Sequence, residues 1–307
     1  MTHRIRTALA LAAAWVLMST PQSRAGQLLY VSNFGNNTVS QIDSAGNVST
    51  FASSGLSSPL GLAFDAAGNL YVTNLGDNTV SEFSSTGASK GTFASGLSIP
   101  EGLAFDTAGN LYVANTGTSS ILEFSATGAS KGTFASGLSF PAGLAFDAAG
   151  NLYVANLGNN TVSQIDSTGH VTTFASSGLN GPAGLAFDAA GNLYVANTNA
   201  GTVSEFSATG ASKGTFAFGL SDPIGLEFDA AGNLYVANNV AGTVSEFSST
   251  GTSMGTFASG LSGPEFLAFA PTLSAVPEPG ALTLAGIGLA TLLGYGRLRC
   301  RRAAPAP

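Results

Sequence analysis

Three glutamates are the residues with which this 307-residue chain could do chemistry, because each places a carboxylate where a repeated pattern has an apolar residue. Glu227 replaces the alanine of a repeated Gly-Leu-Ala-Phe run. Glu101 and Glu265 follow a proline, at a position that elsewhere holds Leu60, Ala142, Ala183 and Ile224. Burying an unpaired carboxylate is costly, and such oxygen ligands suit Ca²⁺ or Mg²⁺. The three are therefore candidate ligand or ion contacts, and solvated carboxylates are the alternative interpretation.

Other common catalytic arrangements lack their residues. Residues 26–275 contain one histidine, His170, and neither cysteine nor arginine. A Ser-His-Asp or Cys-His site would need His170 buried beside a nucleophile, but its surroundings predict a turn. A zinc site would need several His or Cys ligands. We expect a protein that is not an enzyme and has no cofactor, with bound Ca²⁺ and carboxylate-metal catalysis as the alternatives.

The charge distribution excludes one large class of partner. Residues 26–275 carry three lysines against nine Asp and seven Glu, a net charge of −13, while all seven arginines lie outside this range. Nucleic-acid binding needs clustered Lys and Arg, so no nucleic-acid partner is expected. The lysines are expected in equivalent turns, too far apart to form a patch; they are Lys90, Lys131 and Lys213.

The glutamates belong to a 41-residue unit that is repeated six times. A repeat of this kind determines the fold before any local pattern does. Three residue types keep the 41-residue spacing: Pro59, Pro100, Pro141, Pro182, Pro223 and Pro264; Tyr30, Tyr71, Tyr112, Tyr153, Tyr194 and Tyr235; and Asn33, Asn74, Asn115, Asn156, Asn197 and Asn238.

Each unit predicts four short strands. In the unit that starts at Pro141, the runs 143–146, 152–156, 161–165 and 171–175 are rich in β-forming residues and are separated by turn residues. Four strands in each 41-residue unit are typical of a propeller blade. The chain enters at a second-strand match, 28–33, and leaves after a first-strand match, 265–269. We therefore predict an all-β, six-bladed propeller over residues 26–270, closed by its first and last strands.

The unit resembles the NHL repeat, the blade of a family of six-bladed propellers. The resemblance covers residues 28–269 and rests on Pro141, Gly143, Phe146, Asp147, Gly150 and Tyr153 and their equivalents. It implies the same closed ring. Six-bladed relatives with gluconolactonase-like activity hold a divalent ion with Glu, Asn and Asp at the channel, which is the basis of the alternative function, a metal-dependent hydrolase.

Comparison of the copies predicts one uniform face and one varied face. The turn between the first two strands is nearly invariant, whereas the loop after the second strand and the residues around each proline differ. Binding residues usually lie on loops held by a rigid scaffold, so we place any ligand on the varied face. The alternative is that these loops differ only because the packing there tolerates sequence drift. The asparagine set is expected to bond its own loops, and the turn aspartates to form turns: Asp65, Asp106, Asp147, Asp188 and Asp229.

The N-terminus has the three parts of a secretory signal peptide. Arg4 and Arg6 precede an apolar stretch, and Ser23 and Ala25 supply the small residues before a cleavage site at Gly26. We predict a signal peptide over 1–25, removed by signal peptidase, so that the protein is exported. An uncleaved anchor is the alternative.

The C-terminus is similar to the PEP-CTERM sorting signal of Gram-negative bacteria. A linker, 271–280, contains Pro277, Glu278 and Pro279; an apolar span, 281–296, and an Arg-rich cytoplasmic tail, 297–307, follow. The resemblance implies that an exosortase-type enzyme recognises these three residues and removes the transmembrane helix. It also implies that the protein acts where exopolysaccharide and biofilm are produced. A plain membrane anchor is the alternative.

Together these features predict an exported, non-catalytic propeller that serves as a surface or extracellular-matrix binding module. The C-terminal span would hold it in the inner membrane before processing, and the protein would then reach the cell surface or the medium. Its expected partners are the processing enzymes and a polysaccharide or surface protein.

Overall fold

The computed structural model describes residues 26–271. The predicted signal peptide, the Pro-Glu-Pro motif, the transmembrane span and the Arg-rich tail lie outside the described residues. Within residues 26–271, no helix is long and apolar enough to cross a membrane.

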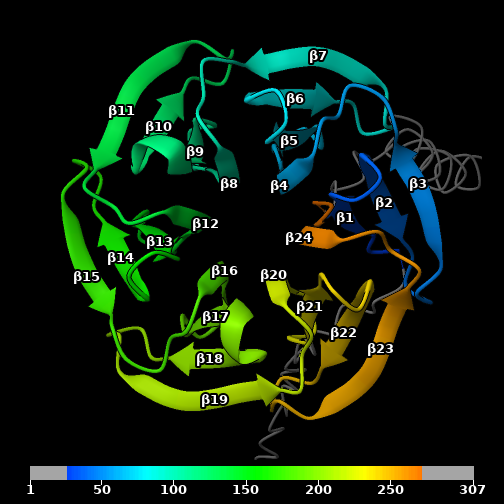
Figure 1. Ribbon diagram of the computed structural model, residues 1–307, viewed down its shortest axis with the longest axis vertical. Helices are drawn as coiled ribbons and strands as arrows, with labels where there is room; N and C mark the ends of the chain where they lie inside the picture. The colour runs from blue at the N-terminus through cyan, green and yellow to red at the C-terminus, as the bar shows by residue number, and fades with distance from the viewer. Residues whose placement is uncertain (1–25, 272–307) are drawn as a thin grey trace, which may run out of the picture. The chain divides into compact units, whose positions relative to one another are not determined.

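Six four-stranded antiparallel sheets surround a central axis, as the repeat predicts (Figure 1). We call the strands of each blade a to d from the axis outward. The first three blades after the N-terminal strands are β4 (Pro59–Phe64), β5 (Leu70–Asn74), β6 (Thr79–Phe83), β7 (Ser89–Ala94); β8 (Pro100–Phe105), β9 (Leu111–Asn115), β10 (Ser120–Phe124), β11 (Ser130–Ser136); and β12 (Pro141–Phe146), β13 (Leu152–Asn156), β14 (Thr161–Ile165), β15 (Val171–Ala175).

The remaining blades complete the ring. They are β16 (Pro182–Phe187), β17 (Leu193–Asn197), β18 (Thr202–Phe206), β19 (Ser212–Phe218); β20 (Pro223–Phe228), β21 (Leu234–Asn238), β22 (Thr243–Phe247), β23 (Ser253–Ser259); and the closing blade β24 (Pro264–Phe269), β1 (Leu29–Asn33), β2 (Thr38–Ile42), β3 (Val48–Ala52). Two 3₁₀ turns, η1 (Thr116–Thr118) and η2 (Thr198–Ala200), lie between strands b and c. Strand a begins at the proline itself, two residues earlier than predicted, since proline is tolerated at the first position of a strand.

The predicted closure of the ring is confirmed. The C-terminal strand β24 pairs antiparallel with β1, with Leu29 opposite Phe269 and Val31 opposite Leu267. The Ser32 hydroxyl accepts a hydrogen bond from the Phe266 N–H (3.2 Å) and donates to the Leu60 carbonyl of the next blade (2.5 Å). Pairing of the two chain ends removes the free sheet edge that an open array would expose.

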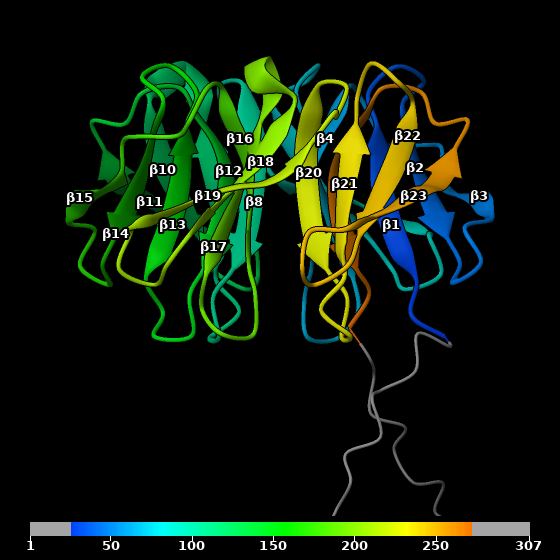
Figure 2. The ribbon, with the colours of Figure 1, turned by 90° about the horizontal axis from the view of Figure 1, so that it is seen from below.

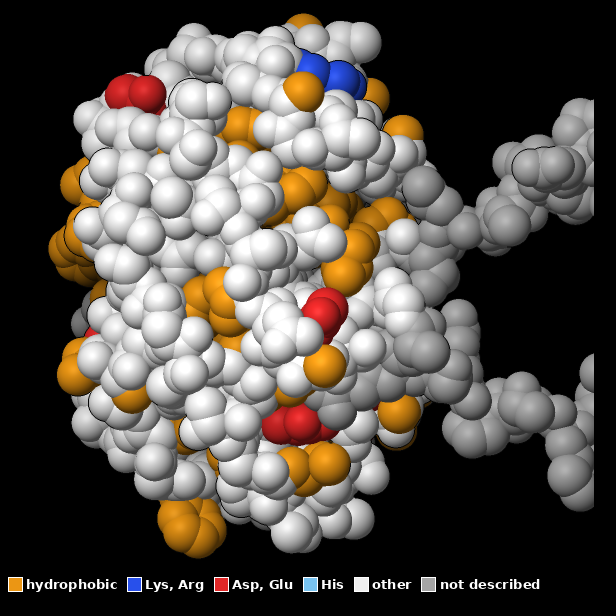
Figure 3. Space-filling view, turned by 90° about the vertical axis from the view of Figure 1, so that its right-hand side faces the viewer, with side chains coloured by type: hydrophobic (Ala, Val, Ile, Leu, Met, Phe, Trp, Pro, Cys, Tyr) orange, Lys and Arg blue, Asp and Glu red, His pale blue; other side chains and the backbone are white. Residues whose placement is uncertain are grey.

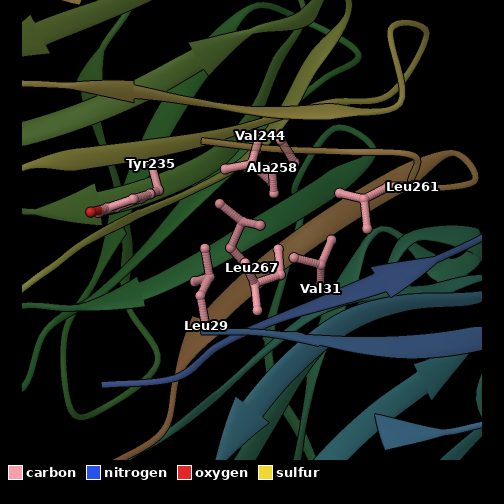
Figure 4. Close-up of a cluster of buried hydrophobic side chains, with 9 residues drawn as sticks. Leu29, Val31, Tyr235, Val244, Ala258, Leu261 and Leu267 are labelled. Atoms are coloured by element: carbon pink, nitrogen blue, oxygen red, sulfur yellow. The ribbon is translucent and has the colours of Figure 1, made fainter. Parts of the chain in front are cut away.

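Strand b of every blade is buried along its whole length, because it lies between strands a and c and between neighbouring blades. The hydrophobic core is therefore divided among the spaces between blades. Figure 4 shows one such space, where Leu29, Val31 and Leu267 of the closing blade contact Val244 and Ala258 of the preceding blade. Burial of each large aliphatic side chain contributes about 2 kcal/mol.

The repeated tyrosine joins each blade to the next. The Tyr71 ring meets Phe93 of its own blade at 4.8 Å and Phe105 of the next blade at 4.9 Å, both edge-to-face. The same pair of contacts recurs at all six tyrosines, including Tyr235 with Phe269 across the closing blade. Such pairs contribute about 0.5–1.5 kcal/mol each beyond their burial. The repeated aromatic residues therefore form part of the core between blades.

The innermost strands approach one another so closely that only glycine fits at the second residue after the proline in five blades. A Cβ on Gly102 would lie 2.4 Å from the Ala142 carbonyl oxygen and 3.0 Å from the Gly143 Cα. The closing strand has Phe266 at this position. The closing blade therefore differs from the others where it borders the axis.

The two faces of the ring follow from strand direction. Turns a–b and c–d lie on one face, the turn face, and loops b–c and d–a lie on the other, the loop face, which is uppermost in Figure 2. In the turn after β12, the Asp147 Oδ1 accepts the N–H groups of Ala149 (2.9 Å) and Asn151 (2.8 Å). The other repeated aspartates do the same, which confirms their predicted role as turn formers.

Candidate functional site

Glu101 lies at the loop-face end of β8, where the innermost strand begins. Its side chain is half-buried, and burial raises the pKa of this carboxyl to about 7, although an interaction with the Thr116 hydroxyl opposes the shift. Thr116 opens η1 and donates its hydroxyl to the Pro141 carbonyl (2.5 Å). The b–c loop of the same blade therefore fixes the Thr116 hydroxyl beside Glu101.

Glu265 occupies the equivalent position on the closing strand β24. Its Oε1 accepts a hydrogen bond from the Asn239 Nδ2 (2.7 Å), which comes from the neighbouring blade. Burial and the negative charges of Glu101 and Asp222 together raise the pKa of Glu265 to about 8. The charges of Glu101 and Asp222 thus act on Glu265 at the loop-face end of the axis, and we call these three residues the carboxylate mouth.

Asp222 is the member of this group that sequence reasoning did not single out. It directly precedes the proline that starts β20, with a positive φ of 57°, and burial raises its pKa. Its carbonyl oxygen accepts the N–H of Asn239 (3.0 Å), so it lies in the same loop pair as the partner of Glu265. The sequence feature that could have revealed Asp222 is the variation of the residue before the proline, which is Ile99, Phe140 or Asp222 in different copies.

Glu227 lies apart from the carboxylate mouth. It is the fifth residue of β20, opposite Tyr235, toward the turn-face end of the strand. Burial raises its pKa to about 7, and the Phe228 N–H partly offsets this. Glu227 is not among the charges that act on Glu265. The structure therefore brings together two of the three predicted glutamates.

The carboxylates do not form an ion site with three ligands. Among residues 26–271, no group of three or more His, Cys, Asp or Glu side chains lies close enough to hold a metal ion. Members of the carboxylate mouth come from three different blades, β8, β20 and β24. His170 is exposed in the turn before β15, as predicted.

The repeated asparagine has a structural role, as predicted, but its backbone partner lies in the loop before strand a and not in its own loop. The Asn74 Nδ2 donates to the hydroxyls of Thr79 (3.2 Å) and Ser81 (2.9 Å), and its Oδ1 accepts the Ser57 N–H (3.0 Å). In four further copies the asparagine Oδ1 accepts the equivalent backbone N–H. Asn33 of the closing blade is the exception, because its buried Oδ1 has no hydrogen-bond partner.

Exposed apolar side chains gather on the loop face. Five large hydrophobic residues there are at least 40% exposed, and we call them the apolar rim: Phe34, Ile99, Phe140, Leu157 and Val240. Figure 3 shows the ring from its side, with hydrophobic side chains along the left-hand margin, which is the face toward the viewer in Figure 1. The concentration of exposed apolar residues on one face makes the loop face the candidate interaction surface.

Positive charge is confined to the outer strands within the described ring. The three lysines lie in the fourth strands β7, β11 and β19, not in turns as predicted. Each pairs with a glutamate of the adjacent strand c, because antiparallel register places the two side chains together; the pairs are Lys90 with Glu82, Lys131 with Glu123 and Lys213 with Glu205. The loops of the loop face contain no Lys, Arg or His.

Solved structures share this fold over most of the chain. A chain in the crystal structure of a nidogen/laminin complex has a TM-score of 0.74 at 20% identity, covering 80% of this chain and 99% of that chain. A protein of unknown function from Bacteroides caccae has a TM-score of 0.65 at 17% identity, covering 80% and 98%. Virginiamycin B lyase from Staphylococcus aureus has a TM-score of 0.62 at 14% identity, covering 81% and 92%.

These likenesses establish the class of fold. No protein-family model matches the chain, and no curated protein sequence is similar to it. The protein is a six-bladed β-propeller of four-stranded blades, closed by a strand from each end of the described chain. Its loop face combines the apolar rim and the carboxylate mouth.

Proposed function

We propose that this chain is an exported, non-catalytic propeller that serves as a binding module at the cell surface or in the extracellular matrix. The observation that carries the proposal is the loop face, which presents exposed apolar side chains and carboxylates on a hydrogen-bonded scaffold. Such a surface suits a partner that presents apolar groups. One structural neighbour comes from a complex of nidogen with laminin, which is compatible with a propeller that binds another protein.

A retention assay tests the binding function. Purified full chain is mixed with extracellular matrix from a Gram-negative biofilm that contains exopolysaccharide and surface proteins. We expect the Phe140→Ser/Val240→Ser variant to be retained at least fivefold less than the unaltered chain, since both side chains belong to the apolar rim. The matched control is Val48→Ser/Met254→Ser, which removes exposed apolar side chains from the outer strands. Equal retention of all three proteins would contradict the proposal.

We also propose NHL-type blades, cleavage before Gly26 and exosortase-type sorting through Pro277, Glu278 and Pro279. The sequence patterns at the two ends support the last two of these steps. Mass spectrometry of chain recovered from a PEP-CTERM-sorting host is expected to show Gly26 as the first residue and to lack the Arg-rich tail. A Pro277→Ala/Pro279→Ala variant should keep the tail in the membrane fraction. An intact tail on the unaltered chain would favour the plain anchor.

The rival function is a metal-dependent, gluconolactonase-like hydrolase. Within the described residues the carboxylates do not gather around one ion position, so the binding function has the stronger support. An ion bound at a site would stabilise the folded state by mass action and raise the melting temperature. Without such a site, we expect millimolar Ca²⁺ or Mn²⁺ to change the melting temperature by less than about 1 °C. A shift that a Glu101→Gln/Glu227→Gln/Glu265→Gln variant abolishes would restore the enzyme interpretation.

A further inference from the structure

We infer that the loop face docks a partner protein through a segment in which a basic side chain is flanked by apolar side chains. The basic group would meet the carboxylate mouth, and the flanking side chains would cover the apolar rim. This inference rests on the proposed binding function and names the chemistry of the partner.

Most of the exposed large apolar side chains lie on the loop face. Of eight large hydrophobic residues exposed among the described residues, five belong to the apolar rim. The other three, Val48, Phe218 and Met254, lie on the outer strands. Val240 is 74% exposed and Phe140 is 58% exposed. Large aromatic and aliphatic side chains on an otherwise polar face are typical of the central part of a protein interface.

The apolar rim is linked to the carboxylate mouth. Val240 follows Asn239, whose side chain bonds Glu265 and whose N–H bonds the Asp222 carbonyl (3.0 Å). On the other side of Glu265, the Phe34 N–H donates to the Gly263 carbonyl (3.0 Å). Apolar and acidic groups of the closing blade and its neighbour are therefore held in one hydrogen-bonded unit.

The same pairing of loops recurs around the ring. The Leu157 N–H donates to the Phe140 carbonyl (3.1 Å), and the Thr116 N–H donates to the Ile99 carbonyl (3.1 Å). Rim residues thus sit on loops that the backbone already orders. A preordered surface loses less conformational entropy when a partner binds.

Charge complementarity favours a basic partner. Asn239 links Glu265 and Asp222 in one loop pair. The charges of Glu101 and Asp222 act on Glu265, and the loops of this face supply no basic residue. The three lysines of the described ring are engaged with glutamates on the outer strands. A guanidinium or ammonium group can pair with a single one of these carboxylates, whereas no three carboxylates of the described residues lie close enough to hold a metal ion. An acidic polysaccharide would be repelled, so the charges favour a basic protein segment.

Synthetic peptides provide the test. Three fluorescent nonapeptides share one length: one has a central arginine flanked by leucine and phenylalanine, one replaces that arginine with glutamate, and one keeps the arginine but has serine flanks. Fluorescence anisotropy with the purified full chain at pH 9, above the pKa of about 8 of Glu265, is expected to show at least tenfold tighter binding of the first peptide. The Asp222→Asn/Glu265→Gln variant should lose about tenfold in affinity, and Phe34→Ser/Val240→Ser should lose a similar factor. Val48→Ser/Met254→Ser is the control and should bind as the unaltered chain does.

Each remaining outcome counts against the inference. Equal binding of the arginine and glutamate peptides would overturn the role of charge, provided that melting temperatures show the variants to be folded. Unchanged affinity in Asp222→Asn/Glu265→Gln would remove the carboxylate mouth from the interface. If no peptide binds but purified exopolysaccharide does, and rim variants weaken it, the binding function survives and this inference fails. If neither binds the loop face, both fail.

Discussion

At the scale of the residue, the pKa values of the mouth carboxylates tie the stability of the ring to pH. The pKa of Glu265 rises to about 8 and that of Glu101 to about 7, chiefly because both are partly buried. A raised carboxyl pKa in the folded state means that the folded protein binds the proton more tightly than the unfolded chain does. The contribution of these two carboxyls to stability is therefore fully present below the unfolded pKa, near 4.5, and is lost as pH rises toward 8. The turn aspartate Asp147 acts in the opposite sense: burial alone would raise its pKa, but the hydrogen bonds that it accepts lower the pKa overall, so its contribution is lost in acid.

The Glu265→Gln substitution isolates the largest of these effects. Glutamine keeps an oxygen for the Asn239 amide and carries no charge, so it avoids the cost of an ionised group beside Glu101 and Asp222. At pH 9 we expect the variant to be about 1–2 kcal/mol more stable than the unaltered chain, after allowance for solvent screening, and to melt about 2–6 °C higher. At pH 4 the two should melt together. Thermal denaturation across pH, with the exposed loop variant Asp77→Asn as control, measures the difference; an equal gain at pH 4 would contradict the explanation.

At the scale of the element, the innermost strands depend on the absence of a side chain at one position. Gly102 lies against the next blade, so that an added methyl group would approach the Ala142 carbonyl to 2.4 Å. The atoms that it would meet belong to the backbone of β12, which cannot rotate away as a flexible side chain could. The repeated Pro-x-Gly pattern therefore records a packing requirement of the ring as well as a local strand preference.

Replacement of Gly102 by alanine is expected to destabilise the ring by about 3 kcal/mol, which is at the upper end of the cost of overpacking. The matched control is Gly132→Ala on the outer strand β11, where φ is +96° but nothing lies within 4 Å of the added Cβ. That control bears only backbone strain, about 1 kcal/mol. Urea denaturation of both variants measures the two losses. A smaller loss at Gly102 than at Gly132 would show that the inner strands can separate to admit a methyl group.

At the scale of the whole molecule, the sequence predicted the ring because each repeated residue has the same task in every blade. Tyr71 and its equivalents join blades, and Asp147 and its equivalents close turns, so the period alone indicated the architecture. The grouping of Glu265 with Asp222 and Glu101 could not be predicted in the same way. These residues lie in different copies of the repeat. The repeat alone does not predict which of the side chains that depart from it lie close together in the ring. The Lys–Glu pairs were missed for a similar reason, since they depend on the register of strands c and d.

Closure of the ring by both ends of the described chain leads to the last prediction. Removal of residues 263–307 deletes β24, so that β1 loses its inner partner and Tyr235 loses its contact with Phe269. An exposed edge strand pairs readily with another chain, so we expect this truncated protein to form oligomers or aggregates rather than a stable monomer. The matched control removes residues 272–307 and keeps β24; it should melt within about 2 °C of the full chain, a shift equivalent to less than about 1 kcal/mol. Size-exclusion chromatography and thermal denaturation compare the two. A stable monomer without β24 would show that five complete blades hold the fold and that pairing of the ends is dispensable.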